Sequence, residues 1–354
     1  MAEKILVLSE PDFSIYKYHG LPEAGLTFFE NTRWGSAGMV YERKNSKDLI
    51  QLLIDPYLFA VQRGDEMVGT AVFCNTRPRV KDREYNAFII RYFAAANSIQ
   101  GKKVIKHYAS RVMDVVRDAE QEKTIYVGCV EKGNARSFHV VSSVGYEVLG
   151  TLKVQAFSRL FPKAQKSLER IDSDPGRQEV LTLLRSSYRN HVLVHFDYLF
   201  LNNHYFVIRN PQHEIVAGCQ YHRVHWAINR MPGVLGKLIM NVLPVIPIIR
   251  RLFNPKRFEF LALEGIYIKP GYESAFHQLM EGILHQEQLT AALFWMGDTC
   301  PYRIALEQYG KLGLLQKFIQ DSGVYIMTSY RNMNPQEIEE LKSGPLYASA
   351  FDYI

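Results

Sequence analysis

The sequence predicts an α/β fold that is built twice, with helices packed on a central mixed β-sheet in each half. Three observations predict it: two similar hairpin segments, the same order of elements after each, and a polar, proline-containing segment between them. A chain of 354 residues is long enough for two domains. Its apolar fraction of 47% and charged fraction of 22% are ordinary for a globular protein, so disorder is excluded.

The first copy begins with a hairpin over 57–73, YLFAVQRGDEMVGTAVF, in which two apolar strands flank the turn at 63–65. Strands and helices then alternate. They are expected over 87–95 (strand), 102–120 (helix), 124–130 (strand), 135–144 (helix) and 146–159 (closing strand). The first helix is predicted from apolar residues such as Val104, Tyr108 and Val112, which recur with a helical period.

The second copy begins with a hairpin over 205–221, YFVIRNPQHEIVAGCQY, around a turn at 210–212. Its later elements follow the same order, and they are expected over 258–268 (strand), 274–288 (helix), 291–296 (strand), 302–309 (helix) and 323–330 (final strand). A polar segment over 161–177 is the expected linker. We therefore predict two domains, at 1–165 and 178–354.

The second copy carries an apolar insertion over 226–257. Its stretch 234–253, VLGKLIMNVLPVIPIIRRLF, is long enough to suggest a membrane span. However, Lys237 interrupts it, and Pro244 and Pro247 would break a helix. We expect the insertion to cover the core or to line a substrate pocket. Contact with a membrane surface remains as an alternative.

The net charge of +6 is mild, and the basic residues are scattered. A nucleic-acid-binding protein would show a dense basic stripe, so we expect no nucleic-acid partner. A mild positive surplus also attracts a polyanionic cofactor. The four cysteines form no C-x-x-C pair, so no metal site is expected. Because the first residues also lack a signal-peptide pattern, the expected location is cytoplasmic.

The segment 93–108, FAAANSIQGKKVIKHY, follows a strand and opens a helix. Backbone N–H groups and the dipole at a helix start favour anions such as a pyrophosphate. The segment resembles the acyl-CoA-binding motif of the GNAT superfamily, in which a splayed strand is followed by Q/R-x-x-G-x-G/A. Gln100 stands at the first position, Lys103 and Ile105 replace the small residues, and Gly101 is the only glycine of the loop.

A second motif of that superfamily is N-x-x-A-x-x-x-Y-x-x-x-G-F. In the first copy, Asn134, Ser137 and Gly145 match it, but Val141 occupies the tyrosine position. The second copy is complementary, because it fills that position with Tyr309. Its cofactor loop, 269–276, carries Glu273, whose carboxylate would repel a pyrophosphate. The resemblance therefore implies that the cofactor site lies in the first copy.

The resemblance covers 50–159 and 199–330 and implies a tandem GNAT protein with one degenerate copy. It implies an N-acetyltransferase that transfers an acyl group, expected to be acetyl, directly from acetyl-CoA or another acyl-CoA as cofactor to a small-molecule or peptide amine as acceptor. The residues implied to bind the cofactor are Phe93, Ala94, Ala95, Gln100, Gly101, Lys102, Lys103, Val104, Asn134 and Phe138. Backbone N–H groups near 91–95 would form an oxyanion hole.

The candidate catalytic residues are Glu131 as general base, Glu264 as its counterpart in the second copy, and Tyr309 as an acid for the departing thiolate. Two other interpretations remain open. Val141 and the missing glycines are typical of a non-catalytic protein that binds CoA or another ligand. The apolar stretch 234–253, which ends in Arg250 and Arg251, suits a lipid-linked acyl or aminoacyl transferase at a membrane surface.

Overall fold

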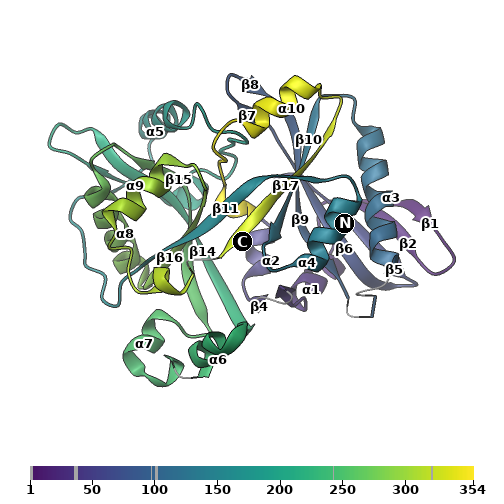
Figure 1. Ribbon diagram of the computed structural model, residues 1–354, viewed down its shortest axis with the longest axis horizontal. Helices are drawn as coiled ribbons and strands as arrows, with labels where there is room; N and C mark the ends of the chain where they lie inside the picture. The colour runs from purple at the N-terminus through teal and green to yellow at the C-terminus, as the bar shows by residue number, and fades with distance from the viewer. Residues whose placement is uncertain (1–2, 36–38, 97, 100–102, 242, 320–321) are drawn as a thin grey trace.

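The computed structural model describes residues 3–35, 39–96, 98–99, 103–241, 243–319 and 322–354. Through this part of the chain runs one mixed sheet of 15 strands, with helices on both of its faces (Figure 1). The main path of the sheet follows the order β1-β2-β5-β6-β9-β10-β17-β11-β16-β15-β14-β13-β12. The predicted fold class, a mixed sheet flanked by helices, is confirmed.

The sheet strands of the first half are β1 (Glu3–Ser9), β2 (Ser14–His19), β3 (Trp34–Gly35), β4 (Val40–Arg43), β5 (Pro56–Arg63), β6 (Glu66–Thr76), β9 (Asn86–Ala95), β10 (Thr124–Glu131) and β11 (Glu147–Ser158). The second half contributes β12 (Leu168–Arg170), β13 (Tyr205–Arg209), β14 (Ile215–Arg230), β15 (Phe258–Ile268), β16 (Ala291–Gly297) and β17 (Gly323–Arg331). A separate small hairpin consists of β7 (Arg79–Val80) and β8 (Arg83–Glu84).

The α-helices are α1 (Glu23–Glu30), α2 (Ser46–Ile50), α3 (Lys103–Ala119), α4 (Ala135–Ser143), α5 (Asp174–Ser187), α6 (Gly233–Asn241), α7 (Pro247–Leu252), α8 (Glu273–Glu287), α9 (Pro301–Tyr309) and α10 (Pro335–Lys342). Short 3-10 turns are η1 (Leu201–Asn203), η2 (Leu243–Val245), η3 (Leu315–Phe318) and η4 (Ala350–Asp352). The predicted repeat is present as β5-β6-β9-α3-β10-α4-β11 and β13-β14-β15-α8-β16-α9-β17.

The expected linker over 161–177 is wrong in two places, because β12 lies within it and pairs with β13, and because α5 begins at Asp174. The sequence Ser173-Asp174-Pro175-Gly176 contains turn-forming residues, and it equally marks a helix start. The Ser173 side chain accepts a hydrogen bond from the Gly176 N–H, and the proline occupies the first turn. Turn residues at a linker and cap residues at a helix start are therefore hard to separate in sequence.

The two halves exchange their closing strands. β11 of the first half pairs antiparallel with β16 of the second, and β17 of the second pairs antiparallel with β10 of the first. β11 and β17 also pair with each other, so they lie side by side at the centre of the sheet. Each half thus has its parallel pair, β9–β10 or β15–β16, completed by the other half.

This exchange predicts that neither half folds well alone. Residues 1–165, expressed separately, would leave the edge of β10 without β17, although its residues Ile125 and Tyr126 are fully buried in the whole chain. We expect this fragment and 178–354 each to aggregate or to melt without cooperativity, because an exposed apolar edge pairs non-specifically. Circular dichroism and sedimentation of each fragment test this. A soluble 1–165 fragment with a cooperative thermal transition would show that the exchange is dispensable.

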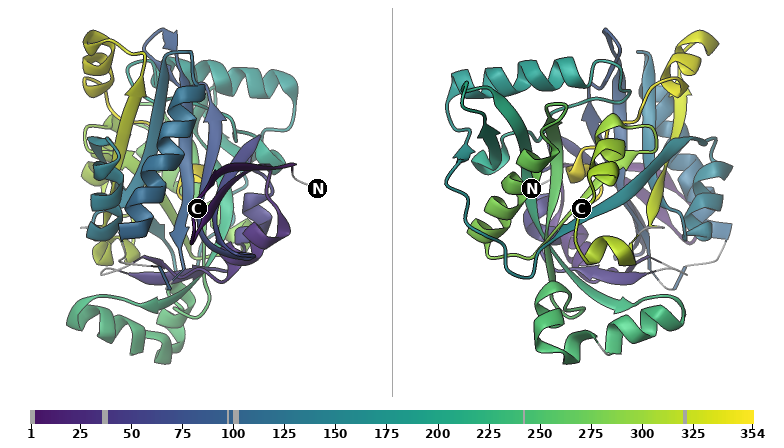
Figure 2. Two further views of the ribbon diagram at one scale, coloured as in Figure 1. Left: turned by 90° about the vertical axis from the view of Figure 1, so that its right-hand side faces the viewer. Right: turned by 60° about the vertical axis from the view of Figure 1, so that its left-hand side comes forward.

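One segment of the first half also joins the sheet of the second. β4 pairs with the far end of β14, with Arg43 opposite Trp226 and Tyr41 opposite Ile228. β14 continues into the insertion, where α6, η2 and α7 form a lobe that projects from the sheet (Figures 1 and 2). We call residues 231–257 the lobe. Among the described residues, no helix is long and apolar enough to cross a membrane.

Candidate functional site

The parallel strands β9 and β10 separate where the site forms. They pair only as far as Ile90 and Gly128, so the ends of both strands diverge. β9 also carries a bulge. Two of its residues, between Arg91 and Ala94, lie opposite a single residue of the neighbouring strand β6. At the bulge Tyr92 adopts a φ of 48°, which is uncommon for a residue with a side chain. A bulge takes backbone groups out of the ladder and aims them elsewhere, here toward the gap.

The second half repeats this geometry and then closes it. Its register moves from Glu264 to Tyr267, and Gly265 adopts a φ of 56°. The carbonyl oxygen of Gly265 accepts a hydrogen bond from Tyr205 Oη at 2.9 Å, and Ser349 donates one to Glu264. Chain segments of the protein therefore occupy the second gap.

The start of α8, next to that gap, is also unsuited to a phosphate group. The N–H of Gly271 donates a hydrogen bond to Glu273 Oε1 at 3.3 Å. This carboxylate therefore lies where an anion would have to bind, and it would repel a phosphate. The occupied second gap and the carboxylate at the start of α8 both favour a cofactor site in the first half.

A cavity of about 620 Å³ lies at the β9–β10 gap. Its lining comes from both faces of the sheet, because it contains members of two apolar clusters, and these clusters lie on opposite faces, since the side chains of β5 alternate between them. One set of residues, which we call the helix side, lies beneath α3 and α4 and includes Phe59, Tyr108, Ala109, Val112, Val141 and Tyr146. The other set, the lobe side, includes Trp226, Ile228, Ile239, Leu293, Trp295 and Phe318. The cavity thus connects the two faces where the strands separate.

Glu131, the last residue of β10, lies at the cavity. Burial raises the pKa of this carboxyl, while a hydrogen bond from Tyr41 and the nearby Arg43 partly oppose the rise. The Tyr41 Oη donates that bond to Glu131 Oε1 at 3.0 Å, and its ring stacks on Trp226 with 4.3 Å between centroids. A positioned carboxylate of raised pKa can take up a proton from a bound group.

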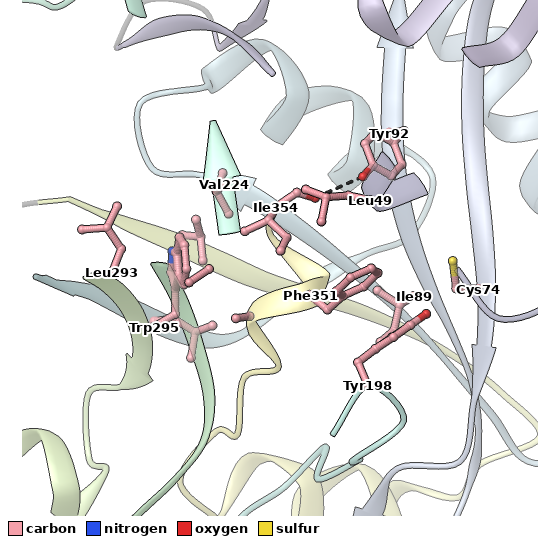
Figure 3. Close-up of a cluster of buried hydrophobic side chains, with 14 of the residues drawn as sticks. Leu49, Cys74, Ile89, Tyr92, Tyr198, Val224, Leu293, Trp295, Phe351 and Ile354 are labelled. Carbon is pink, nitrogen blue, oxygen red and sulfur yellow. Dashed lines mark hydrogen bonds between the residues drawn. The ribbon is translucent and has the colours of Figure 1, made fainter. Parts of the chain in front are cut away.

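Arg43 is one of the cationic residues that line the cavity. Its guanidinium lies 4.8 Å from the ring centroid of Trp34 and 5.3 Å from that of Tyr92, and it donates to the carbonyl oxygen of Tyr353 at 3.1 Å. Tyr92 Oη in turn donates to the carbonyl oxygen of Ile354 at 3.1 Å (Figure 3). Residues 353–354 are thereby held in the cavity wall.

A buried ionic network holds the same tail from the other side. Arg91, just before the bulge, forms an ion pair with Asp352. His195 Nε2 lies 2.9 Å from the second oxygen of Asp352, and its Nδ1 lies 3.3 Å from Asp197. Burial opposes the charge on His195, but the two aspartates outweigh it and raise its pKa to about 10. Asp352 lines the cavity, so this network fixes part of its wall.

The structure places the predicted cofactor residues as follows. Phe93, Ala94, Ala95 and Asn134 line the cavity, and Val104 and Phe138 pack against the apolar cluster beneath α3 and α4. The Asn134 side chain also caps α4 by accepting a hydrogen bond from the Ser137 N–H at 3.1 Å. Gln100, Gly101 and Lys102 lie outside the described residues, as does the side chain of Lys103, whose backbone begins α3.

The structure does not bring the three candidate catalytic residues together. Glu131 lines the cavity, whereas Glu264 is buried in the closed second gap, with His222 Nε2 at 2.9 Å. Tyr309, at the end of α9, is 37% exposed and packs edge-on against the His277 ring.

Sequence reasoning missed Tyr41 and Arg43. They belong to a four-residue strand that precedes the segment on which the resemblance rests. The alternation of an aromatic and a cationic residue on one face of that strand is the only local signal.

Comparison with known proteins gives the fold. No family model matches the chain, and no curated protein matches it. Saccharomyces cerevisiae N-myristoyltransferase with bound myristoyl-CoA matches 95% of this chain and 88% of its own, with a TM-score of 0.60 and 9% identity. A structure of the same enzyme with myristoyl-CoA and inhibitors matches 93% of this chain and 84% of its own, with a TM-score of 0.58 and 10% identity.

A GCN5-related N-acetyltransferase from Anabaena variabilis also matches, over 77% of this chain and 62% of its own, with a TM-score of 0.42 and 9% identity. The likeness to the N-myristoyltransferase structures shows that the chain has the fold of that acyl-CoA-binding enzyme. The predicted resemblance is confirmed at the level of the fold.

Proposed function

We propose that the protein is an acyl-CoA N-acyltransferase that transfers an acyl group from coenzyme A to an amine at the β9–β10 gap. The observation that carries the proposal is one cavity that joins the two sheet faces at this gap, with an apolar helix side and a partly buried carboxylate, Glu131. The yeast N-myristoyltransferase of the same fold was crystallised with an acyl-CoA, which supports such a donor.

In this proposal the donor binds along β9 and the start of α3. The pyrophosphate lies at the N-terminus of α3, where backbone N–H groups and the helix dipole favour anions. Phe93 to Ala95 line the path of the thiol arm into the cavity. The bulge at Tyr92 and Phe93 presents backbone N–H groups to the thioester oxygen, as an oxyanion hole requires.

The acceptor amine enters from the lobe side. Glu131, whose pKa is raised, takes a proton from the ammonium, and the freed amine attacks the thioester carbonyl. The tetrahedral oxyanion collapses, the carbon–sulfur bond breaks, and the coenzyme A thiolate leaves and takes up the proton that the new amide nitrogen loses. A thiol is acidic enough to leave without a strong acid, so Val141 at the tyrosine position is compatible with this chemistry. Holding both reactants at the gap supplies much of the rate.

The size of the cavity favours an acyl chain longer than acetyl. At about 620 Å³ it falls within the range of sites that bury drug-sized ligands, and the helix side is apolar. Ala109, which lines it, offers a test. In Ala109→Trp, we expect the affinity for tetradecanoyl-CoA to fall by about tenfold or more, equivalent to about 1.4 kcal/mol, while acetyl-CoA binding changes little. Calorimetric titration measures both.

The exposed Ala164→Trp serves as the matched control, and Val141→Phe provides a second block if Ala109→Trp is unstable. Equal losses for both donors would show that the helix side does not hold the chain. Unchanged binding of both would show the same. If the wild-type protein bound acetyl-CoA more tightly than tetradecanoyl-CoA, the transferred acyl group would be a short one.

Turnover tests the function itself. The protein is incubated with tetradecanoyl-CoA and a mixture of short peptides and small amines, and free thiol is measured together with the mass of the products. Amine-dependent thiol release and acylated products are expected. Tight acyl-CoA binding without any release over the whole mixture would instead indicate a protein that binds acyl-CoA without catalysis.

A further inference from the structure

The lobe has an exposed apolar face that the proposed chemistry does not use. Four aliphatic side chains from α6, the η2 turn and the segment into α7 are solvent-exposed: Leu238 (50%), Val245 (76%), Ile246 (42%) and Ile248 (55%). The lobe projects from the sheet and lies at an extremity of the molecule (Figures 1 and 2). Several exposed aliphatic side chains within one short lobe indicate an interaction surface.

The charged residues of the lobe itself are all cationic. Residues 231–258 contain the cations Lys237, Arg250, Arg251, Lys256 and Arg257 and no aspartate or glutamate. All five are exposed. Arg257 pairs with Glu259 at 3.2 Å, and Arg251 lies over the ring of Phe161 at 4.8 Å. Exposed aliphatic side chains and exposed cations on one lobe suit the interface of an anionic bilayer, where the apolar groups insert and the cations contact phosphates.

The opposite side of the lobe faces the cavity. Ile239, Leu252 and Phe253 are buried and line its lobe side, directly next in sequence to exposed residues such as Leu238. The same short helices therefore present one face to the cavity and the other to the surroundings. A surface bound by the lobe would lie close to the entrance that an apolar substrate needs.

We propose that the lobe docks the protein on the surface of an anionic lipid bilayer, with Leu238, Val245, Ile246 and Ile248 inserted among the headgroups and Lys237, Arg250 and Lys256 on lipid phosphates. This proposal concerns a surface, and it holds whether or not acyl transfer takes place. A second copy fits less well, because a symmetric contact would set identical cationic faces against each other.

The test is co-sedimentation of the full chain with vesicles of phosphatidylcholine alone or mixed with phosphatidylglycerol. Wild-type protein is expected to bind the anionic vesicles, with weaker binding as salt rises. The double variant Val245→Asp with Ile248→Asp is expected to lose most of this binding. At about 1 kcal/mol per cation, Lys237→Gln with Arg250→Gln and Lys256→Gln is expected to lower the partition coefficient about a hundredfold.

Matched controls are Ile304→Asp, on an exposed site of α9, and the triple variant Lys163→Gln, Lys166→Gln and Arg185→Gln. Both are expected to bind as wild type does. The proposal is overturned if wild type does not bind anionic vesicles, or if the control variants lose as much binding as the lobe variants. It is also overturned if sedimentation velocity finds a dimer that Val245→Asp abolishes, since a second copy would then occupy the face.

Discussion

Replacing Glu131 with glutamine is expected to slow acyl transfer by about a hundredfold to ten-thousandfold, the usual contribution of a general base. Glutamine keeps an oxygen that can accept the hydrogen bond from Tyr41, so the cavity wall is preserved. Thiol release measures the rate, and acyl-CoA affinity and thermal stability are expected to stay close to wild type. Glu84→Gln, at an exposed site, is the matched control and should keep full activity.

The role of Glu131 as a base also predicts how the activity changes with pH. Glu131 acts as a base only when it is ionised, so activity should fall as the pH drops through its raised pKa. Tyr41→Phe removes a hydrogen bond that lowers this pKa, and the acid limb of the pH–rate profile should therefore move to higher pH. If Glu131→Gln retained wild-type activity and pH profile, another group would have to accept the proton.

The largest effect on stability is expected from Asp352→Ala. It leaves Arg91 and His195 buried without their shared partner, and breaking a buried pair in this way costs about 3–5 kcal/mol. Urea denaturation measures the loss. Asp298→Ala is the control, because the Asp298 side chain forms an exposed ion pair with Lys153 at 3.5 Å, and its removal should change stability by about 1 kcal/mol or less.

His195 adds a pH signature to this prediction. Its pKa is raised from 6.5 to about 10, so its stabilising contribution is complete below pH 6.5 and is lost as the pH rises toward 10. The unfolding free energy of the wild type should decline over this range. In Asp352→Ala the decline should be smaller. If Asp352→Ala and Asp298→Ala lowered the unfolding free energy by the same amount, the result would contradict the role of the network.

The repeated fold could be predicted because its signals are local. The hairpins at 57–73 and 205–221 carry turn residues between β-forming runs, and the helix α3 buries Tyr108, Val112 and Val116 at helical spacing. The exchange of β11 and β17 could not be predicted. Both strands have similar local patterns, and their pairing partners are decided by contacts far apart in the chain.

The candidate site could be predicted only in outline. The splay near 91–95 and the position of Glu131 follow from the order of elements, but Tyr41 and Arg43 reach the cavity only because β4 joins the end of β14. The tail at 349–354 fills the second gap and also contributes to the first, again through distant contacts. The apolar insertion was expected to line a pocket, and its buried face does line the cavity.

A crystal structure with a non-hydrolysable ketone analogue of tetradecanoyl-CoA, in which a methylene group separates the sulfur from the carbonyl, tests the central claim most directly. The account predicts the acyl chain on the helix side of the cavity, beside Ala109 and Val141, with the carbonyl at the Tyr92–Phe93 bulge and the coenzyme at the start of α3. A coenzyme bound at the start of α8, or an acyl chain outside the cavity, would contradict it.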